Sequence, residues 1–343
     1  MSFKISVIIP CFNSEEYLHR SVTSVINQSF GFENIELILY DDCSTDSTKD
    51  IILEYAKQFN NIIPIFADEN SGPGKGRNEG IKVASSEHIM FLDSDDSYDY
   101  NMCETLFKEI NAENADLVSC SYLNIDSFGK EECIHRYYCN NGEKEVDGKL
   151  IFNSRFQFTS GGVTSTCIFK RRIILENNIK FLEESVYEDE YFLIQYYYHA
   201  YKVVYLKNYF GINRFVQNDS ASSLYTLDEI NIGQDHIQDL FDNIKDENFN
   251  FSQIFGYRIF TILLGIYISK PIFKSKNDLK KLLMKVHDFE NEINFDEKLP
   301  LIVGIANYFI RFEHYNIAII FLRFLNILHD SRVMRKVYRL ISG

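Results

Sequence analysis

Four short apolar runs decide the fold of this chain: residues 5–10 (ISVIIP), 35–40 (IELILY), 62–66 (IIPIF) and 88–92 (HIMFL). Their first residues lie 30, 27 and 26 positions apart. Runs of this length that are apolar almost throughout are typical of strands buried on both faces of a parallel sheet. The spacing leaves room for a crossover helix between each pair of strands, as parallel pairing requires.

The segments between these runs carry helix signals. Residues 13–16 and 44–47 hold polar capping residues, and each set precedes apolar residues at helical spacing. A third helix is predicted over residues 77–84, after a glycine-rich stretch at 72–76 that predicts a pliable loop. Alternating strands and helices predict an open α/β fold, in which ligands bind at the carboxyl ends of the strands.

A mixed pattern follows from about residue 100. Helices are predicted over 100–111 and 188–199, and strands over 116–122, 163–170 and 202–206. Beyond residue 225 the strands stop, and long apolar stretches have helical spacing. We therefore expect residues 1–100 and 101–224 to form two halves of an α/β domain, and residues 225–343 to form a C-terminal α-helical extension.

Composition and charge exclude several classes of protein. The chain is 45% hydrophobic and 24% charged, as in ordinary globular proteins. A net charge of −14 repels phosphate backbones, so we expect no nucleic-acid partner. Seven cysteines without CxxC spacing predict reduced thiols rather than a disulfide framework or a zinc module. With no signal-peptide pattern and no apolar stretch of about 20 residues, we expect a cytoplasmic protein without a transmembrane helix.

Polar and acidic residues follow each predicted strand. They include residues 41–42 (DD) and 93–96 (DSDD). Neither the glycine-rich dinucleotide fingerprint nor the GxxxxGK[ST] phosphate loop follows the first strand. A diphosphate at this edge therefore needs a cation, and carboxylates are the ligands that Mg²⁺ and Mn²⁺ prefer. An acidic loop that caps a helix is the structural alternative.

Four motifs together resemble those of the family 2 glycosyltransferases, which have the GT-A fold: residues 4–13 (KISVIIPCFN), 40–48 (YDDCSTDST), 70–81 (NSGPGKGRNEGI) and 91–96 (FLDSDD). They occur in family order and spacing, and weaker matches continue to about residue 222. The resemblance implies a Rossmann-like, mixed but mainly parallel sheet between helices. Residues 1–100 would form its nucleotide-sugar-binding half and residues 101–224 its acceptor-binding half.

The resemblance also implies the reaction. Family members invert the sugar in a single displacement, and we expect metal-dependent transfer from a nucleotide-sugar, a UDP-sugar in our prediction. The expected acceptor is a hydroxyl of a cell-surface glycan, polysaccharide or glycolipid precursor.

The motifs assign residues to the nucleotide. Asp41 is expected to accept a hydrogen bond from uracil N3–H, and Arg77 to reach the base or the diphosphate. The structural alternatives are a turn role for Asp42, a helix-dipole role for Glu15 and a surface ion pair for Arg77. The predicted nucleotide-binding residues are Pro10, Phe12, Asn13, Glu15, Asp41, Asp42, Arg77, Asp93, Ser94, Arg214 and Ser220.

The metal and the base are also implied by resemblance. The last aspartate of the family's DXD motif holds Mn²⁺ or Mg²⁺, which assigns Asp95 as a metal ligand and places Asp93 at the ribose and beside the metal. Residues 188–190 (EDE) resemble the Glu-Asp signature, which implies that Asp189 deprotonates the acceptor. Glu188 and Glu190 stay open as alternatives, and an acidic first turn is the structural explanation.

Two other functions are kept as alternatives. A catalytically inactive nucleotide-sugar-binding or assembly module would not need both Asp95 and Asp189. A sugar nucleotidyltransferase would need a glycine-rich loop after the first strand, where residues 10–15 offer none. The last 43 residues carry six basic and two acidic side chains. We therefore expect the C-terminal region to form a homo-oligomer interface or a peripheral contact with an anionic membrane.

Overall fold

The computed structural model describes residues 3–134, 145–146, 163–183 and 187–215, with isolated positions beyond residue 231. The chain divides into two compact units. The first comprises Met1–Asn218 with Ile232–Leu240, and the second comprises Asp219–Asn231 with Phe241–Gly343. Nearly all of the second unit lies outside the described residues, so the helical extension stays a prediction.

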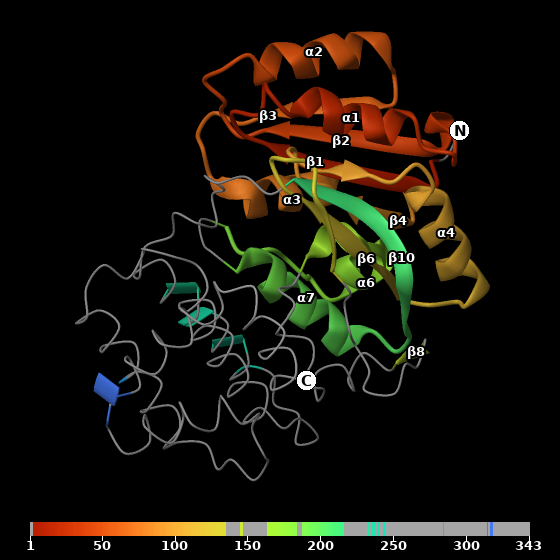
Figure 1. Ribbon diagram of the computed structural model, residues 1–343, viewed down its shortest axis with the longest axis vertical. Helices are drawn as coiled ribbons and strands as arrows, with labels where there is room; N and C mark the ends of the chain where they lie inside the picture. The colour runs from red at the N-terminus through yellow and green to blue at the C-terminus, as the bar shows by residue number, and fades with distance from the viewer. Residues whose placement is uncertain are drawn as a thin grey trace. The chain divides into compact units, whose positions relative to one another are not determined.

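The first unit is built on one mixed sheet (Figure 1). Its order is β3-β2-β1-β4-β9-β6-β10-β5, with β7 paired to β6 and β8 to β10. The strands are β1 (Ile5–Cys11), β2 (Ile35–Asp41), β3 (Ile62–Phe66), β4 (His88–Phe91), β5 (Ser97–Tyr98), β6 (Leu117–Ile125), β7 (Glu131–Ile134), β8 (Glu145–Val146), β9 (Cys167–Lys170) and β10 (Val203–Phe215).

The pairing confirms the expected mixed, mainly parallel sheet. Strand β1 pairs in parallel with β2 and β4, β2 with β3, and β6 with β10. Strand β9 lies between β4 and β6 and is antiparallel to both. Since β6 therefore runs in the same direction as β4, the carboxyl ends of β1, β2, β4 and β6 lie along one edge of the sheet.

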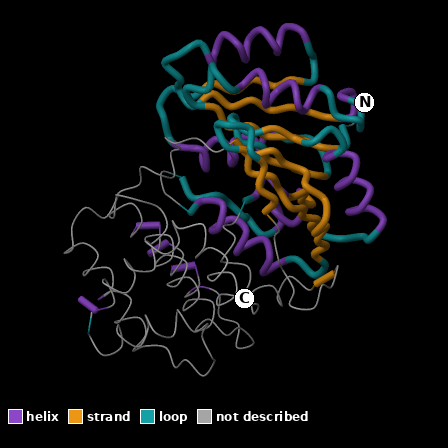
Figure 2. The backbone as a smooth tube through the Cα atoms, in the orientation of Figure 1, coloured by secondary structure: helices purple, strands orange, loops and turns teal. Residues whose placement is uncertain are grey.

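Helices cover both faces of this sheet (Figures 1 and 2). They are α1 (Leu18–Ile26), α2 (Thr48–Gln58), α3 (Gly72–Val83), α4 (Met102–Ala112), α6 (Arg171–Glu176) and α7 (Glu188–His199). Ile5, Val7 and Ile9 of β1 pack in one cluster with residues of α1, α2 and α4. Ile8 points to the other face, where a Cβ on Gly80 of α3 would lie 2.4 Å from its Cγ2 atom.

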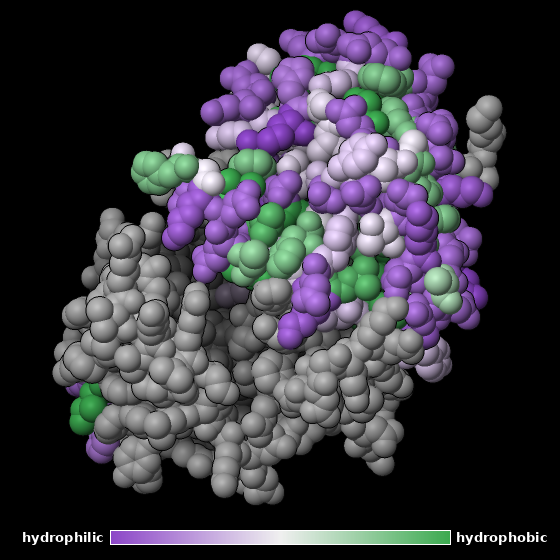
Figure 3. Space-filling model, turned by 45° about the vertical axis from the view of Figure 1, so that its right-hand side comes forward, coloured by the Kyte–Doolittle hydropathy of each residue, from purple (hydrophilic) through white to green (hydrophobic). Residues whose placement is uncertain are grey.

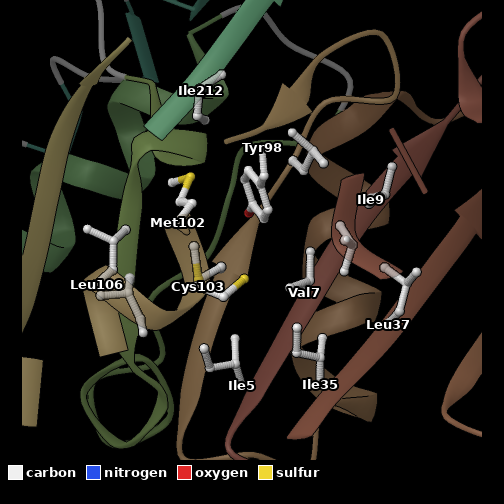
Figure 4. Close-up of a cluster of buried hydrophobic side chains, with 14 of the residues drawn as sticks. Ile5, Val7, Ile9, Ile35, Leu37, Tyr98, Met102, Cys103, Leu106 and Ile212 are labelled. Carbon is white, nitrogen blue, oxygen red and sulfur yellow. The ribbon is translucent and has the colours of Figure 1, made fainter. Parts of the chain in front are cut away.

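One hydrophobic core crosses the boundary between the two predicted halves. Figure 4 shows Ile5 and Val7 of β1 in the same cluster as Tyr98, Met102 and Ile212. All five side chains are at least 96% buried. On the face shown in Figure 3, by contrast, hydrophilic side chains cover most of the described surface.

The first four strands are confirmed to within one residue, but the predicted start of the third helix is wrong. Helix α3 begins at Gly72 instead of residue 77. The carboxylate of Asp42 accepts a hydrogen bond from the Gly72 N–H, and Pro73 lies in the first turn, where its missing N–H is not needed. A Cβ on Gly74 would lie 1.8 Å from the carbonyl oxygen of Leu182. The glycines therefore allow close packing, and the pliable loop over 72–76 is also wrong.

Two later strands also differ from their predictions. The segment predicted as a strand over 163–170 begins as a 3-10 turn at Thr164–Thr166, and only Cys167–Lys170 forms β9. The strand predicted over 202–206 continues to Phe215, with two register irregularities between Leu206 and Ile212 against β6. Within the described part of the chain, no helix is both long enough and apolar enough to cross a bilayer.

Candidate active site

The loop after β1 is joined to the loop after β2. Asn13 has a positive φ of 46°, and its Oδ1 accepts the Thr45 N–H at 2.8 Å. Glu15 Oε2 accepts the Ser47 N–H at 2.9 Å. Both predicted base-binding residues therefore fix the shape of this edge. Phe12, the first residue after β1, is 48% exposed, so its ring is accessible to a stacking partner. Pro10 lies within β1, and its Cβ would be 3.1 Å from a Cβ on Gly76.

Asp41 and Asp42 have different surroundings at the end of β2. The Asp42 carboxylate accepts the N–H groups of Ser71 at 3.0 Å and Gly72 at 2.8 Å. Burial raises its pKa, these two bonds oppose the rise, and Asp41 adds to it. Asp42 therefore caps the start of α3, a structural role that differs from the turn role given as its alternative. Asp41 is 2% exposed, and its Oδ1 meets no donor within the described part of the chain. An unpaired buried acceptor is costly, and a donor on a ligand would satisfy it.

The loop of Asp93 to Asp96 is held from α1 and β10. Ser94 Oγ lies 2.7 Å from Ser14 Oγ, and Asp96 Oδ1 accepts the Phe215 N–H at 3.1 Å. The Arg20 guanidinium donates to the carbonyl of Asp95 and stacks on the Phe215 ring at 3.5 Å from its centroid. The loop therefore has a fixed position at the end of β4.

Carboxylates dominate the charge of this loop. Burial raises the pKa of Asp95, and repulsion from Asp93 adds to the rise, while Arg214 and Arg20 oppose it. The pKa of Arg214 is raised, because attraction to Asp96, Asp93 and other groups outweighs the effect of burial. Arg214, the last-but-one residue of β10, thus faces the acidic loop.

The donor set of this loop fits a hard divalent cation. Asp93 and Asp95 would supply oxygen ligands, and a cation would relieve the repulsion that raises the pKa of Asp95. Among the described residues, no three His, Cys, Asp or Glu side chains are grouped closely enough to hold a metal by themselves. Two aspartates with ligand oxygens completing the shell are an arrangement that Mg²⁺ commonly adopts.

Arg77 joins the two halves of the site. Its Nη2 lies 2.7 Å from Asp93 Oδ1, and its Nη1 lies 3.1 Å from Glu188 Oε1 and 3.4 Å from Asp189 Oδ1. Burial alone would lower the pKa of Arg77, but the three carboxylates raise it above its ordinary value. The side chain is only 4% exposed, so the alternative of a surface ion pair is wrong.

Asp189 begins α7 and is held from a distant segment. Its Oδ1 accepts the Thr164 hydroxyl at 2.8 Å, and its Oδ2 accepts the Thr164 N–H at 3.3 Å. Burial raises the pKa of Asp189, whereas Arg77 and the two Thr164 bonds oppose the rise. Burial also raises the pKa of Glu188. The first turn of α7 therefore places two buried carboxylates with raised pKa values against one guanidinium.

The structure brings together Asp93, Arg77 and Asp189, a grouping that the sequence did not predict. The contact of Arg77 with the base or the diphosphate stays a prediction, and in this structure its two terminal nitrogens lie against carboxylates. Ser220, one of the predicted nucleotide-binding residues, lies outside the described residues. Thr164 was missed, because a lone threonine before an apolar run carries no signal beyond strand propensity.

This arrangement defines a class: an α/β protein whose strand ends gather acidic residues for a nucleotide-type ligand. A family model described as "Glycosyl transferase family 2" matches residues 6–177, half of the chain. The chain belongs to this family, and the expected enzyme class, glycosyltransferase, is confirmed at this level.

Curated relatives agree with the assignment. The chain is 33% identical over 235 residues to a cholesterol galactosyltransferase of Borreliella burgdorferi, covering 66% of this chain and 64% of that protein. It is 35% identical over 205 residues to a poly(ribitol-phosphate) beta-glucosyltransferase of Bacillus spizizenii, covering 58% of this chain and 30% of that protein. The chain thus spans less than two thirds of the length of these relatives.

A solved structure shows the same fold. Residues 1–349 of Staphylococcus aureus TarS, in complex with UDP-GlcNAc, superpose with a TM-score of 0.67 at 21% identity. The superposition covers 98% of this chain and 92% of that chain. The expected GT-A fold is therefore confirmed.

Proposed function

We propose that this protein transfers a sugar from a nucleotide donor, a UDP-sugar, to a hydroxyl of a cell-surface glycan, polysaccharide or glycolipid precursor. The observation that carries the proposal is the shared guanidinium of Arg77. This one guanidinium contacts both Asp93, at the predicted donor side, and Asp189, 96 positions later in the chain. A site for a two-substrate transfer needs a donor-binding carboxylate and a base in this proximity.

Relatives support the choice of substrates. One is named as acting on cholesterol and another on poly(ribitol-phosphate), a lipid and a polymer. The TarS structure contains UDP-GlcNAc. The unpaired Oδ1 of Asp41 suits the N3–H donor of a uracil base, and the exposed ring of Phe12 suits stacking on it.

Asp189 is the proposed general base. It takes the proton of the acceptor hydroxyl as the acceptor oxygen bonds to the anomeric carbon of the sugar. The bond from that carbon to the diphosphate breaks on the opposite side, and its electron pair leaves with UDP. The product therefore has inverted configuration. A pKa raised by burial makes Asp189 a stronger base than an exposed aspartate.

We propose Asp95, together with Asp93, as the residues that hold Mn²⁺ or Mg²⁺. When bound, the ion supplies positive charge against the diphosphate. Arg214 faces the same acidic loop and adds a second positive charge there. The C-terminal region, as an oligomer interface or a peripheral contact at the inner face of the cell membrane, stays a prediction that deletion of residues 310–343 tests by vesicle sedimentation.

A binding and turnover screen tests the proposal. UDP-glucose, UDP-galactose and UDP-N-acetylglucosamine are each added with and without Mn²⁺, and thermal shift and UDP release are measured. We expect stabilisation that needs Mn²⁺, and UDP release that is lost in Asp189→Asn while UDP still binds. If wild type and Asp189→Asn bind UDP equally and neither releases UDP from any donor, the protein is a binding module instead.

A further inference from the structure

Within the proposed function, on which this inference rests, the two oxygens of the Asp189 carboxylate are not equivalent. Oδ1 accepts the Thr164 hydroxyl at 2.8 Å and lies 3.4 Å from Arg77 Nη1. Among the residues that the structure describes, Oδ2 accepts a hydrogen bond only from the Thr164 N–H, at 3.3 Å, which is long for a hydrogen bond. Each carboxylate oxygen offers about two lone-pair sites. Oδ1 therefore has a short hydrogen bond and the attraction of Arg77, whereas Oδ2 has the one long hydrogen bond and is the less engaged oxygen.

We propose that Thr164 is the positioning residue that selects Oδ2 of Asp189 as the proton acceptor. By binding both oxygens, Thr164 fixes the rotation of the carboxylate about its bond to Cβ. Its hydroxyl keeps Oδ1 on the side of Arg77, and the remaining lone pair of Oδ2 receives the proton of the acceptor hydroxyl. Without the hydroxyl, Asp189 is free to turn both oxygens toward Arg77.

The surroundings of Thr164 suit this role. The residue is 1% exposed and lies in the 3-10 turn that leads into β9, the strand between β4 and β6. Its position is therefore set by the centre of the sheet instead of by α7. A base oriented from a rigid strand keeps its geometry when substrates enter and leave.

The same turn contains a matched control. Thr166 is fully buried in this turn, and its hydroxyl donates to the carbonyl of Val163 at 2.9 Å, not to Asp189. Replacing either threonine with valine removes one hydroxyl from the same short turn with little change in volume. Only the change at residue 164 removes a bond to the base.

The test compares Thr164→Val, Thr164→Ser, Thr166→Val and Asp189→Asn in the full chain. UDP release from each of the three UDP-sugars is measured between pH 5 and 9, with water as acceptor, and UDP affinity is measured by calorimetry. We expect Thr164→Val to lower kcat roughly tenfold to a hundredfold. The free energy of a hydrogen bond to a charged group corresponds to a rate change of this size. UDP affinity and the KM of the donor stay within about twofold, because the change is remote from the nucleotide.

The pH profile separates positioning from a general loss of structure. Asp189 faces Arg77 from α3, Asp93 from the loop after β4 and Glu188 from its own helix. Since the Thr164 hydroxyl stabilises the charged carboxylate, its loss displaces the acid limb of kcat to higher pH. Thr164→Ser restores both rate and profile, and Thr166→Val keeps them near wild type.

Each result decides between the two proposals. If Asp189→Asn is inactive while Thr164→Val has the kcat and pH profile of wild type, the positioning role is refuted and the proposed function stands. If Asp189→Asn keeps full activity, the base is another group, so the assignment of Asp189 and the positioning role of Thr164 both fall while sugar transfer from a UDP donor stands. Should Thr164→Val not fold, Thr164→Ala removes the hydroxyl without adding a methyl group in its place, and the same comparison applies.

Discussion

Replacement of Arg77 by methionine removes the cation that three carboxylates share. The side chains of Asp93, Glu188 and Asp189 are 30%, 15% and 19% exposed, so water replaces the lost charge only in part. Removing one partner of a buried ion pair costs about 3–5 kcal/mol. For a folded unit of this size, each kcal/mol lowers Tm by roughly 2–4 °C, so we expect a drop of about 10 °C at pH 7.5.

The loss of stability in Arg77→Met is expected to be larger at neutral pH than at acidic pH. Burial raises the pKa of Asp189 and of Glu188 in the folded protein, and Arg77 opposes the rise. Without Arg77 both values rise further, and the folded state binds protons at a pH where the unfolded chain is still ionised. The deficit is therefore largest above the folded-state pKa values. It shrinks as the pH falls toward the ordinary values of about 4.

Calorimetry of the full chain in EDTA measures the effect, and amide hydrogen exchange in α3 and α7 locates it. Lys82→Met is the matched control, since Lys82 also lies on α3, is 63% exposed and pairs with Glu79 at 2.7 Å. This surface pair is expected to contribute less than about 1 kcal/mol. The reasoning is refuted if Arg77→Met is no less stable than Lys82→Met, or if its deficit is the same at pH 5 and pH 7.5.

Three further changes test the site. Asp42→Ala removes the acceptor at the start of α3 and is expected to lower the free energy of unfolding by about 1 kcal/mol, with faster hydrogen exchange in the first turn of α3; unchanged exchange there would contradict the capping role. Gly74→Ala places a Cβ 1.8 Å from the Leu182 carbonyl oxygen and is expected to cost about 1–3 kcal/mol in denaturant unfolding, against no loss if the segment were a pliable loop. Asp95→Asn is expected to keep or raise Tm in EDTA, because burial and Asp93 raise the pKa of Asp95 and so favour a neutral group. The Mn²⁺-dependent rise of Tm with UDP is expected to disappear in this variant. If that rise persists, Asp95 does not hold the metal.

The sequence predicted the donor-side strands because their burial on both faces leaves uninterrupted apolar runs. It also predicted that Asp41 and the loop of Asp93 to Asp96 lie at strand ends, since polar residues that follow such a run mark where the strand stops. The prediction for α3 failed because glycine occurs both in flexible loops and in helices where another backbone comes close. Gly74 is required by the approach of Leu182, a contact across more than a hundred residues that a local pattern does not contain.

The partners of Arg77 and Asp189 were beyond prediction for the same reason. A single sequence shows that Arg77 lies in a helix, but not that a loop and the start of α7 converge on it. The contact of Thr164 with Asp189 is still harder to predict, because it depends on where the fold places the short turn before β9. The extent of β10 was missed because exposed Lys207 and Asn208 interrupt its apolar pattern, while its pairing with β6 continues past them.

The position of β9 bears on how the chain is made. During synthesis the ribosome releases β1 to β4 well before Lys170, the last residue of β9, has left the exit tunnel. Until then the backbone N–H and C=O groups on the outer side of β4 have no neighbour, and an unpaired strand edge invites association with other nascent chains. The sheet of residues 1–100 is therefore covered at β4 only after residues 101–170 have begun to fold.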